Sequence, residues 1–379
     1  MTQLNFINKP FFEHGAITQI SETLRSLNIN KPLICTDQGI VELGMLDELR
    51  NLISNDITIN VFDKTPSNPT ENAVMEALEI YKKEGCDGII GFGGGSSIDL
   101  GKAVAIMASH KGNLVNYSFN EGGIDKIGET SKLIAIPTTS GTGSEVSSGS
   151  VIIMDDGRKL ILVSPYLVPK AAICDPNLTL GLPTSLTAGA GMDALTHCIE
   201  AILSPIIDPP AEAVGLDGIE RIFKNKNLLI AIKDGSNKEA RWNMMMAATE
   251  GAMAFTKGLG AVHSMSHACG ACQNLRLHHG TLNGVILPTI LRFNQGYVED
   301  KYDRIKLAMG LSDSSELAEA IEILNSEIGL PKNLNAMGIT EKMIPELSQH
   351  SLEDLCTFTN PRTPTLEDYE KLFKEAIGK

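Results

Sequence analysis

The chain has 379 residues, of which 42% are hydrophobic and 21% charged, which suits two globular domains with ordinary cores. Its formal net charge of −14 argues against nucleic acids and anionic membranes as partners, because both need a basic protein surface. We expect no membrane span and no signal peptide, since neither a long apolar run nor a basic leader occurs, and the seven scattered cysteines fit a reducing cytoplasm.

Strand-like and helix-like segments alternate through the first half of the chain. Short apolar or β-rich runs predict strands at residues 32–36, 57–62, 87–92, 132–140 and 171–176. Apolar residues at helical spacing predict helices at residues 41–55, 69–85 and 96–110. Residues 151–164 carry an Asp-Gly turn between two β-rich runs, which predicts a hairpin. Alternation of this kind predicts βαβ units and a mostly parallel sheet.

The second half of the chain has only helical patterns. Helices are predicted at residues 186–203, 209–232, 238–257, 261–275, 278–295, 303–310, 315–328 and 340–350. Glycine and proline within residues 181–184 mark the change of pattern. We therefore expect two domains, an α/β domain over residues 1–181 and an all-α domain over residues 182–379.

Histidines gather in the predicted helices of the second half, where five of the eight fall between residues 197 and 279. Asp193 and His197 are four residues apart, which places both on one face of a helix. The other histidines of this stretch are His263, His267, His278 and His279. A lone histidine is usually a packed or surface residue, but the whole set, with a carboxylate at the right offset, predicts a site for a divalent metal.

Two loops have the composition of a nucleotide site. Residues 91–102, GFGGGSSIDLGK, lie between a predicted strand and helix, so their N–H groups and the helix dipole suit a pyrophosphate; the alternative is a tight turn. Residues 137–145, PTTSGTGSE, carry small hydroxyl donors and are equally compatible with a structural turn.

The pair Cys269 and Cys272 is interpreted as two packed thiols rather than a zinc or redox site.

Five motifs together resemble those of a known family. GGGSSIDLGKA, PTTSGTGSEV, GMDALTHCIEA, GLGAVHSMSHACGA and HHGTLNGVILP occur in the order found in the iron-containing, or group III, alcohol dehydrogenases. The resemblance covers nearly the whole chain. It implies the dehydroquinate synthase-like fold, in which an N-terminal Rossmann-like α/β domain binds NAD and an all-α C-terminal domain binds the metal. In this family the active site lies in the cleft between the two domains.

The resemblance also implies which residues form the metal centre. The implied ligands are Asp193, His197, His263 and His279. The resemblance implies Fe²⁺, the metal that members of this family usually bind, although three histidines and one aspartate also suit Zn²⁺ or Mn²⁺. His267 matches a histidine that lies near the nicotinamide and relays protons, so it is the expected catalytic residue.

The NAD site implied by the resemblance involves both loops and three other positions. The loops contribute Gly94, Gly95, Ser96, Asp99, Thr138, Thr139, Thr142 and Ser144. Asn68 is expected to close the cofactor cleft, and Lys159 matches a lysine that binds ribose. Asp37 follows the first strand, where a carboxylate accepts hydrogen bonds from ribose hydroxyls and repels a 2′-phosphate. We therefore expect NAD rather than NADP.

The implied activity is that of an NAD-linked alcohol dehydrogenase and aldehyde reductase, with hydride transfer between a metal-bound primary alcohol and NAD. Alternatives on the same fold are a hydroxyacid–oxoacid transhydrogenase with tightly bound NAD and a maleylacetate-type reductase. A dehydroquinate synthase is disfavoured, because its characteristic Glu and Lys are missing from GMDALTH. The expected partners are a small alcohol or aldehyde and further copies of the chain, in a homodimer or larger homo-oligomer. Residues 4–8, LNFIN, are the candidate strand for joining subunits.

Three positions bear on the substrate. Arg276 lies in a segment that is longer than in many family members, and it is either a binder of a substrate carboxylate or a surface residue. Gly149 stands where relatives often carry a larger side chain, which indicates room for a bulkier substrate. His278 is interpreted either as a residue of the substrate pocket or as a residue that lies on the surface or packs in the core.

Overall fold

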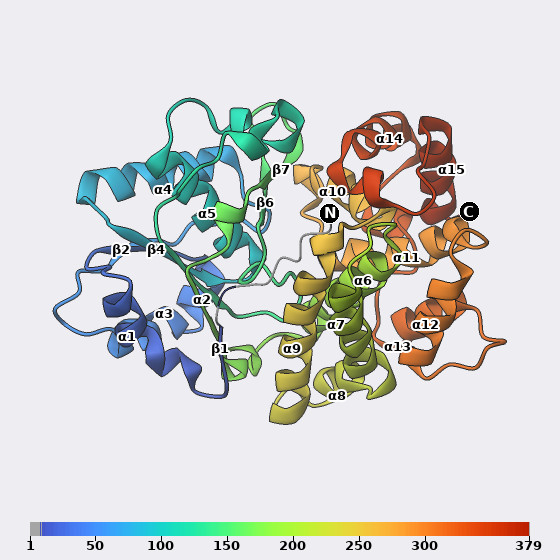
Figure 1. Cartoon of the computed structure of the whole chain (residues 1–379), viewed down its shortest axis with the longest axis horizontal. Coiled ribbons are helices and arrows are strands. Elements are labelled where there is room, and N and C mark those ends of the chain that lie inside the picture. The colour runs from blue at the N-terminus through green and yellow to red at the C-terminus, as the bar shows by residue number, and fades with distance from the viewer. Residues whose placement is uncertain (1–7, 9, 379) are drawn as a thin grey trace. The chain divides into compact units, whose positions relative to one another are not determined.

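The computed structural model describes Asn8 and residues 10–378, which form two compact units (Figure 1). The α/β unit contains the described residues between 8 and 139 together with Ser144–Thr179. The helical unit contains Ser140–Gly143 and the described residues from 180 onward. Except for Asn8, the candidate pairing strand at residues 4–8 lies outside the described residues. Within the described part of the chain, no helix combines the length and the apolar character needed to cross a membrane.

A six-stranded parallel sheet forms the centre of the α/β unit. Its strands are β1 (Phe11–Phe12), β2 (Pro32–Cys35), β3 (Asn60–Phe62), β4 (Gly88–Gly93), β5 (Leu133–Pro137) and β8 (Ala171–Cys174), in the order β1-β8-β5-β4-β2-β3. β6 (Gly149–Ile153) and β7 (Lys159–Val163) form a separate antiparallel hairpin at the predicted Asp-Gly turn. The parallel sheet and the hairpin predicted from the sequence are thus confirmed.

Helices cover both faces of the sheet, as the packing of neighbouring strand residues shows. They are α1 (Ile20–Ser26), α2 (Gln38–Glu42), α3 (Met45–Leu52), α4 (Glu71–Glu84) and α5 (Gly95–Ser109). Leu33 and Ile89 belong to the core formed with α4 and α5. Their neighbours Ile34 and Ile90 belong to the core formed with α1, α2 and α3. Because successive strand residues point to opposite faces, the sheet is the middle of three layers.

The strand order reverses between β2 and β4. The chain runs outward from β2 to β3, then returns to the other side of β2 and continues through β4, β5 and β8. Open parallel sheets bind ligands beyond the carboxyl ends of their strands at such a reversal. Asp37 follows β2, whereas Gly94 and Gly95 follow β4. The topology alone therefore brings three predicted cofactor residues to one edge of the sheet.

Local turns account for two differences from the predicted elements. The helix predicted at 41–55 is divided into α2 and α3, because Gly44 adopts a left-handed φ of 74° between them. The strand predicted at 57–62 begins only at Asn60, because Ile57 N donates to Ser54 O in a turn. The two-residue β1 was not predicted and lies at the edge of the sheet beside β8.

The helical unit contains no strand among its described residues, as predicted. Its helices are α6 (Thr184–Leu203), α7 (Pro209–Ile219), α8 (Asn227–Lys233), α9 (Lys238–Ala254), α10 (Ala261–Gly270), α11 (His279–Asn294), α12 (Glu299–Met309), α13 (Leu317–Glu327), α14 (Ile344–Glu353) and α15 (Leu366–Ile377). α6 is buried along nearly its whole length and packs against α7, α9 and α11. The sequence analysis missed α15, although Thr365 and Asp368 form a capping box at its start.

Candidate active site

Three helices of the helical unit carry the residues predicted as metal ligands. α6 carries Asp193 and His197, α10 carries His263, and α11 begins at His279. The side chains of the first three are 1–5% exposed, and that of His279 is 22% exposed. We refer to these four residues as the histidine cluster. The fold therefore brings all four predicted ligands together inside one core.

The ligand atoms of the histidine cluster converge on one carboxylate oxygen. Asp193 Oδ1 lies 3.8 Å from His197 Nε2 and 3.9 Å from His263 Nε2. Its distance to His279 Nε2 is 3.6 Å. Ligand atoms about 2.1 Å from a tetrahedrally bound ion are roughly 3.4 Å apart, so these separations are close to those that a divalent metal requires. The imidazoles of His197 and His263 also stack, with 4.6 Å between their ring centroids.

Partners on the second ring nitrogen orient two of the imidazoles. His263 Nδ1 lies 2.6 Å from Glu200 Oε2, and His279 Nδ1 lies 2.8 Å from Ser266 Oγ. A hydrogen on Nδ1 donates to each of these oxygens and leaves Nε2 as the atom directed at Asp193. Such carboxylate and hydroxyl partners are typical of histidines that bind metals, because they fix both the tautomer and the ring orientation.

Burial sets the protonation of His197 and of Glu200 beside the cluster. It lowers the pKa of His197 to about 4, against the opposing charge of Asp193, so that this ring is neutral as a metal ligand must be. Burial also raises the pKa of Glu200 to about 7, although N–H donors such as that of Val262 partly offset it. The ring of Phe255 lies 5.0 Å from that of His197 and supplies an apolar wall. Neutral imidazoles with one carboxylate form a donor set that fits Fe²⁺.

His267, the predicted catalytic residue, lies beside the histidine cluster. Its ring stacks on that of His279 with 5.3 Å between the centroids, and its Nδ1 lies 2.9 Å from Asp354 Oδ2. Burial opposes the ionisation of Asp354, but the charge and hydrogen bond of His267 bring the pKa of this carboxyl below its usual value. Cys356 N donates to the other oxygen of Asp354. Asp354 therefore fixes the orientation of the His267 ring through its Nδ1.

Two glycines allow α6 and α11 to approach closely enough to form the cluster. A Cβ on Gly280 would lie 2.2 Å from the carbonyl oxygen of Gly189 and 2.8 Å from Asp193 Cβ. Neither atom can rotate away, because one belongs to the backbone and the other is a Cβ bonded directly to it. A side chain at Gly280 would therefore push His279 away from Asp193.

The carboxyl edge of the sheet collects the predicted cofactor residues of the α/β unit. Gly93 ends β4 with a φ of 147°, and Gly94 precedes α5 without a side-chain cap, so the first N–H groups of α5 suit an anion. A Cβ on Gly93 would lie 3.2 Å from Asp37 Oδ2, and one on Gly94 would lie 3.5 Å from Thr139 Cγ2. Thr138 N donates to Gly93 O over 2.9 Å. We call these residues the glycine edge: Asp37, Gly93, Gly94, Gly95, Thr138 and Thr139.

Several predicted cofactor side chains are engaged within the unit itself. Ser96 Oγ donates to Ser67 O over 2.7 Å. Ser144 Oγ donates to Asp99 Oδ1 over 2.6 Å, and Val151 N donates to Asp99 Oδ2 over 3.0 Å. Burial raises the pKa of Asp99. Asp99 thus braces the second loop and β6 against α5.

The remaining predicted cofactor residues fall in two places. Lys159 and Asn68, which come from separate segments, meet in the α/β unit, where Lys159 Nζ donates to Asn68 Oδ1 over 2.8 Å. Thr142 belongs to Ser140–Gly143, the short segment that groups with the helical unit. The second loop is therefore divided between the units.

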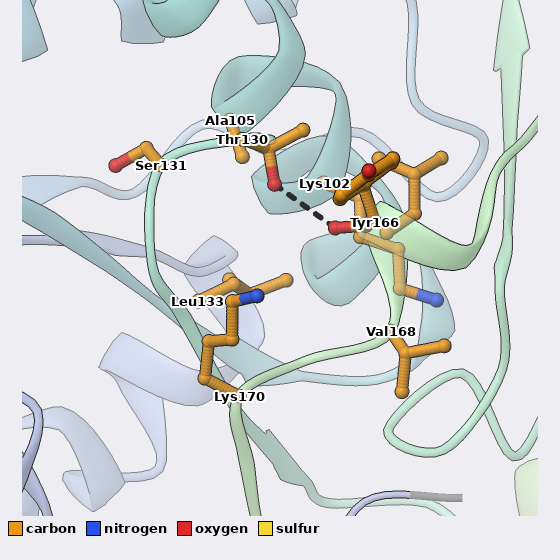
Figure 2. Close-up of a pocket in the computed structure, with 9 residues that line it drawn as sticks. Lys102, Ala105, Thr130, Ser131, Leu133, Tyr166, Val168 and Lys170 are labelled. Atoms are coloured by element: carbon orange, nitrogen blue, oxygen red, sulfur yellow. Dashed lines mark hydrogen bonds between the residues drawn. The ribbon is translucent and has the colours of Figure 1, made fainter. Parts of the chain in front are cut away.

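A narrow hollow lies beside the buried Lys102 in the α/β unit (Figure 2). Its lining residues are Lys102, Ala105, Thr130, Ser131, Leu133, Tyr166, Leu167, Val168 and Lys170. The hollow is too narrow for a water molecule, and Thr130 Oγ1 donates to Tyr166 O in its wall. Lys102 Nζ donates to the carbonyl oxygens of Ser147 and Gly149. We therefore assign this region a packing role rather than a ligand.

The structure also places the other residues that the sequence analysis singled out. Arg276 is exposed and has a φ of 48°, a left-handed conformation that is uncommon for a residue with a side chain. A Cβ on Gly149 would meet no atom within 4 Å, so the space there is open. His278 caps the start of α11, where its Nδ1 accepts a backbone N–H. Cys269 and Cys272 are free thiols, and burial raises the pKa of both.

Sequence reasoning missed the residues that surround the ligands. Glu200 follows His197 by three residues and Asn283 follows His279 by four, so the helical spacing that paired Asp193 with His197 also pointed to both. Asp354 lies 87 residues beyond His267, and no local pattern connects the two. Only the fold reveals this partner.

Family models match both halves of the chain. A model described as iron-containing alcohol dehydrogenase matches residues 8–176, and one described as Fe-containing alcohol dehydrogenase family, C-terminal, matches residues 187–377. The chain belongs to the iron-containing alcohol dehydrogenase family. The predicted family and its two-part fold are confirmed. The predicted activity, that of an NAD-dependent, iron-containing alcohol dehydrogenase and aldehyde reductase, is confirmed with them.

Relatives of this family member cover its full length. The 4-hydroxybutyrate dehydrogenase of Cupriavidus necator is 44% identical over 385 residues, which cover 100% of both proteins. The 1,3-propanediol dehydrogenase of Citrobacter freundii is 36% identical, over 98% of this chain and 97% of that protein. A crystal structure of 1,3-propanediol oxidoreductase has a TM-score of 0.92 and 32% identity, over 99% of this chain and 100% of that one.

Proposed function

We propose that the histidine cluster holds the iron and that a primary alcohol is oxidised, or an aldehyde reduced, at this centre. The observation that supports this assignment is the convergence of three imidazole Nε2 atoms on Asp193 Oδ1 within a buried core. When bound, iron and NAD supply a Lewis acid for the substrate oxygen and an acceptor for the hydride. The intact donor set argues against a metal-free reductase of the maleylacetate type.

His267 moves the proton in this proposal. Because Asp354 engages its Nδ1, Nε2 is the atom that takes up the proton leaving the substrate hydroxyl and returns it in the reverse reaction. Glu200 has a different task, since its two oxygens accept from His263 Nδ1 and Val262 N. Glu200 therefore orients a ligand, whereas His267 exchanges the proton.

We propose that residues 1–181 bind NAD, with the glycine edge as the phosphate site, and that residues 182–379 bind the metal. Asp37 supports the choice of NAD. One of its oxygens accepts from Ile40 N and caps α2, and the other faces Gly93. The negative charge thus stands where β2 ends, the position from which such a carboxylate accepts ribose hydroxyls and disfavours a 2′-phosphate.

We further propose that the substrates include ω-hydroxy acids such as 4-hydroxybutyrate. The full-length relative from Cupriavidus necator is named for that compound. Arg276 lies three residues before His279, so the two Cα atoms are at most about 11 Å apart, within reach of an arginine side chain and a short hydroxy acid. Its left-handed backbone costs about 1–2 kcal/mol, and strain of this kind is concentrated at functional sites.

The test measures NADH formation by the anaerobically purified enzyme with 4-hydroxybutyrate and with 1-butanol, before and after chelation and after Fe²⁺ is restored. We expect net NADH from both substrates, lost on chelation and restored by iron, which also separates a dehydrogenase from a transhydrogenase. Arg276→Ala should lower kcat/KM for 4-hydroxybutyrate about 10- to 100-fold, the worth of a hydrogen bond to a charged group. Activity toward 1-butanol should stay within about twofold.

The matched control is Arg50→Ala, which removes an exposed arginine from α3 in the other unit. An equal loss on both substrates, or no loss on either, would remove Arg276 from carboxylate binding. We also propose that the protein is cytoplasmic and forms a homodimer or larger homo-oligomer. Size-exclusion chromatography with light scattering tests the assembly, and cell fractionation tests the location.

A further inference from the structure

One buried amide contacts most of the histidine cluster. Asn283 lies on α11, one turn after His279, and its side chain is inaccessible. Its Nδ2 lies 2.7 Å from Asp193 Oδ1, 3.1 Å from His263 Nε2 and 3.3 Å from His279 Nε2. The three acceptor atoms belong to α6, α10 and α11. A single side chain therefore meets three of the four proposed ligand atoms, each from a different helix.

The orientation of this amide is fixed by charge. Turning it by half a rotation would place Asn283 Oδ1 against the carboxylate oxygen of Asp193, where the two negative atoms repel. In the observed orientation Nδ2 donates to Asp193, while Oδ1 is buried and has no hydrogen-bond partner among the described residues. A buried acceptor left unpaired costs about 1–3 kcal/mol. In this orientation Nδ2 donates to Asp193 Oδ1, which keeps a second lone pair for a metal, whereas each imidazole Nε2 has only one lone pair.

Glu200 and Ser266, the other partners of the cluster described above, contact it from a different side. Glu200 and Ser266 act on the Nδ1 side of the imidazoles, whereas Asn283 acts on the side of the ligand atoms. Asp193 Oδ1 is the atom on which the three Nε2 atoms converge, so its direction determines the geometry of the whole centre. A donor held at 2.7 Å restricts that direction.

We propose, on the basis of the metal centre proposed above, that Asn283 is a positioning residue that orients Asp193 and sets the affinity and coordination geometry of the metal. Asn283 acts on the ligand atoms and not on the substrate. Loss of its amide therefore changes metal binding even in the absence of NAD and alcohol.

The experiment titrates the full-length, metal-depleted protein with Co²⁺, whose visible d–d spectrum reports its coordination geometry. Asn283→Leu, which keeps the branched shape of the side chain and removes the amide, should weaken Co²⁺ binding about 10- to 100-fold, as loss of a metal ligand's partner typically does, and should shift the d–d bands. Asn283→Ala removes the same amide without adding bulk. If crowding prevents the leucine variant from folding, the alanine variant therefore still tests the role of the amide.

Asn325 on α13 provides the matched control. Its Nδ2 donates to Gly284 O over 2.7 Å, and its own Oδ1 is likewise buried without a partner among the described residues. Asn325→Leu should lower the Tm but leave Co²⁺ affinity and spectrum unchanged. Wild-type affinity and spectrum in both Asn283 variants would overturn this proposal alone, and a wild-type protein that binds no Co²⁺ would overturn the metal centre as well.

Discussion

The histidine cluster and the glycine edge are built by different means. In the histidine cluster, side chains from three helices point at one another and their second nitrogens are fixed by Glu200 and Ser266. At the glycine edge, the surface proposed to bind phosphate is backbone, and neighbouring side chains such as Ser144 and Asp99 bond to each other. The comparison teaches that a metal centre depends on individual side chains, whereas a phosphate site depends on the shape of the main chain.

The largest effect should come from the histidine cluster. His263→Ala removes one ligand and the ring that Glu200 orients, so kcat/KM should fall by about 10³-fold or more, the equivalent of several kcal/mol of Lewis-acid stabilisation. Metal analysis of the purified variant should show the loss of iron. His14→Ala, in the α/β unit, is the control and should retain both metal and activity. A His263→Ala enzyme that keeps its iron would contradict the view that the metal centre depends on individual side chains.

The next effect concerns the one charged side chain of the glycine edge. Asp37→Ser keeps a residue that caps α2 but removes the charge, so kcat/KM for NADP should rise about 100-fold, since a like-charge contact costs several kcal/mol. Activity with NAD and NADP is compared at saturating alcohol. Asp47→Ser removes an exposed acid from α3 and should leave the preference unchanged. An unaltered NAD-to-NADP ratio in Asp37→Ser would show that backbone alone selects the cofactor.

A smaller effect is expected from the partner of a ligand. Glu200→Gln keeps an oxygen that accepts from His263 but loses the charge, so metal affinity should fall roughly tenfold, the lower end of the range for such partners. Because burial raises the pKa of Glu200 to about 7, the wild-type carboxylate loses its charge as pH falls through that value. Metal affinity of the wild type should therefore decrease below pH 7 more steeply than that of the variant. Parallel pH profiles, measured by metal titration, would exclude this role.

The smallest effect should come from a side chain beside the glycine edge. Ser144→Ala removes the hydrogen bond to Asp99, which should lower the free energy of unfolding by about 1 kcal/mol in a denaturant titration. The KM for NAD should change less than threefold, because the backbone keeps its shape. A tenfold rise in this KM without loss of stability would mean that Ser144 binds the cofactor directly, which would weaken the comparison.

Spacing along the chain predicted much of the fold and a metal site among the histidines, whereas the family resemblance implied the four ligands. Period-two and period-3.6 patterns depend on local backbone geometry, and so do the intervals between Asp193 and His197 and between His263 and His267. The same logic extends to Glu200 and Asn283, which a search of positions three and four residues from each ligand would have found. Spacing could not predict contacts between distant segments of the chain, such as the contact between His267 and Asp354.

Individual roles at the glycine edge were harder to predict than its location. Glycines after a strand indicate a close approach of the backbone, and the reversal of strand order places Asp37 beside Gly93. A sequence does not show whether a hydroxyl faces a ligand or a neighbour. Ser96 and Asp99 were predicted as cofactor contacts, and these assignments stay predictions, while the hydrogen bonds in the structure give both a bracing role.

The segment Ser140–Gly143 determines how this enzyme can be divided. It groups with the helical unit although Thr139 and Ser144 on either side belong to the α/β unit. Its glycines have no room for side chains, since a Cβ on Gly143 would lie 2.2 Å from Ala252 Cβ. The polypeptide therefore changes units more than once, and a chimera that exchanges the helical half with a relative has to carry these four residues with it.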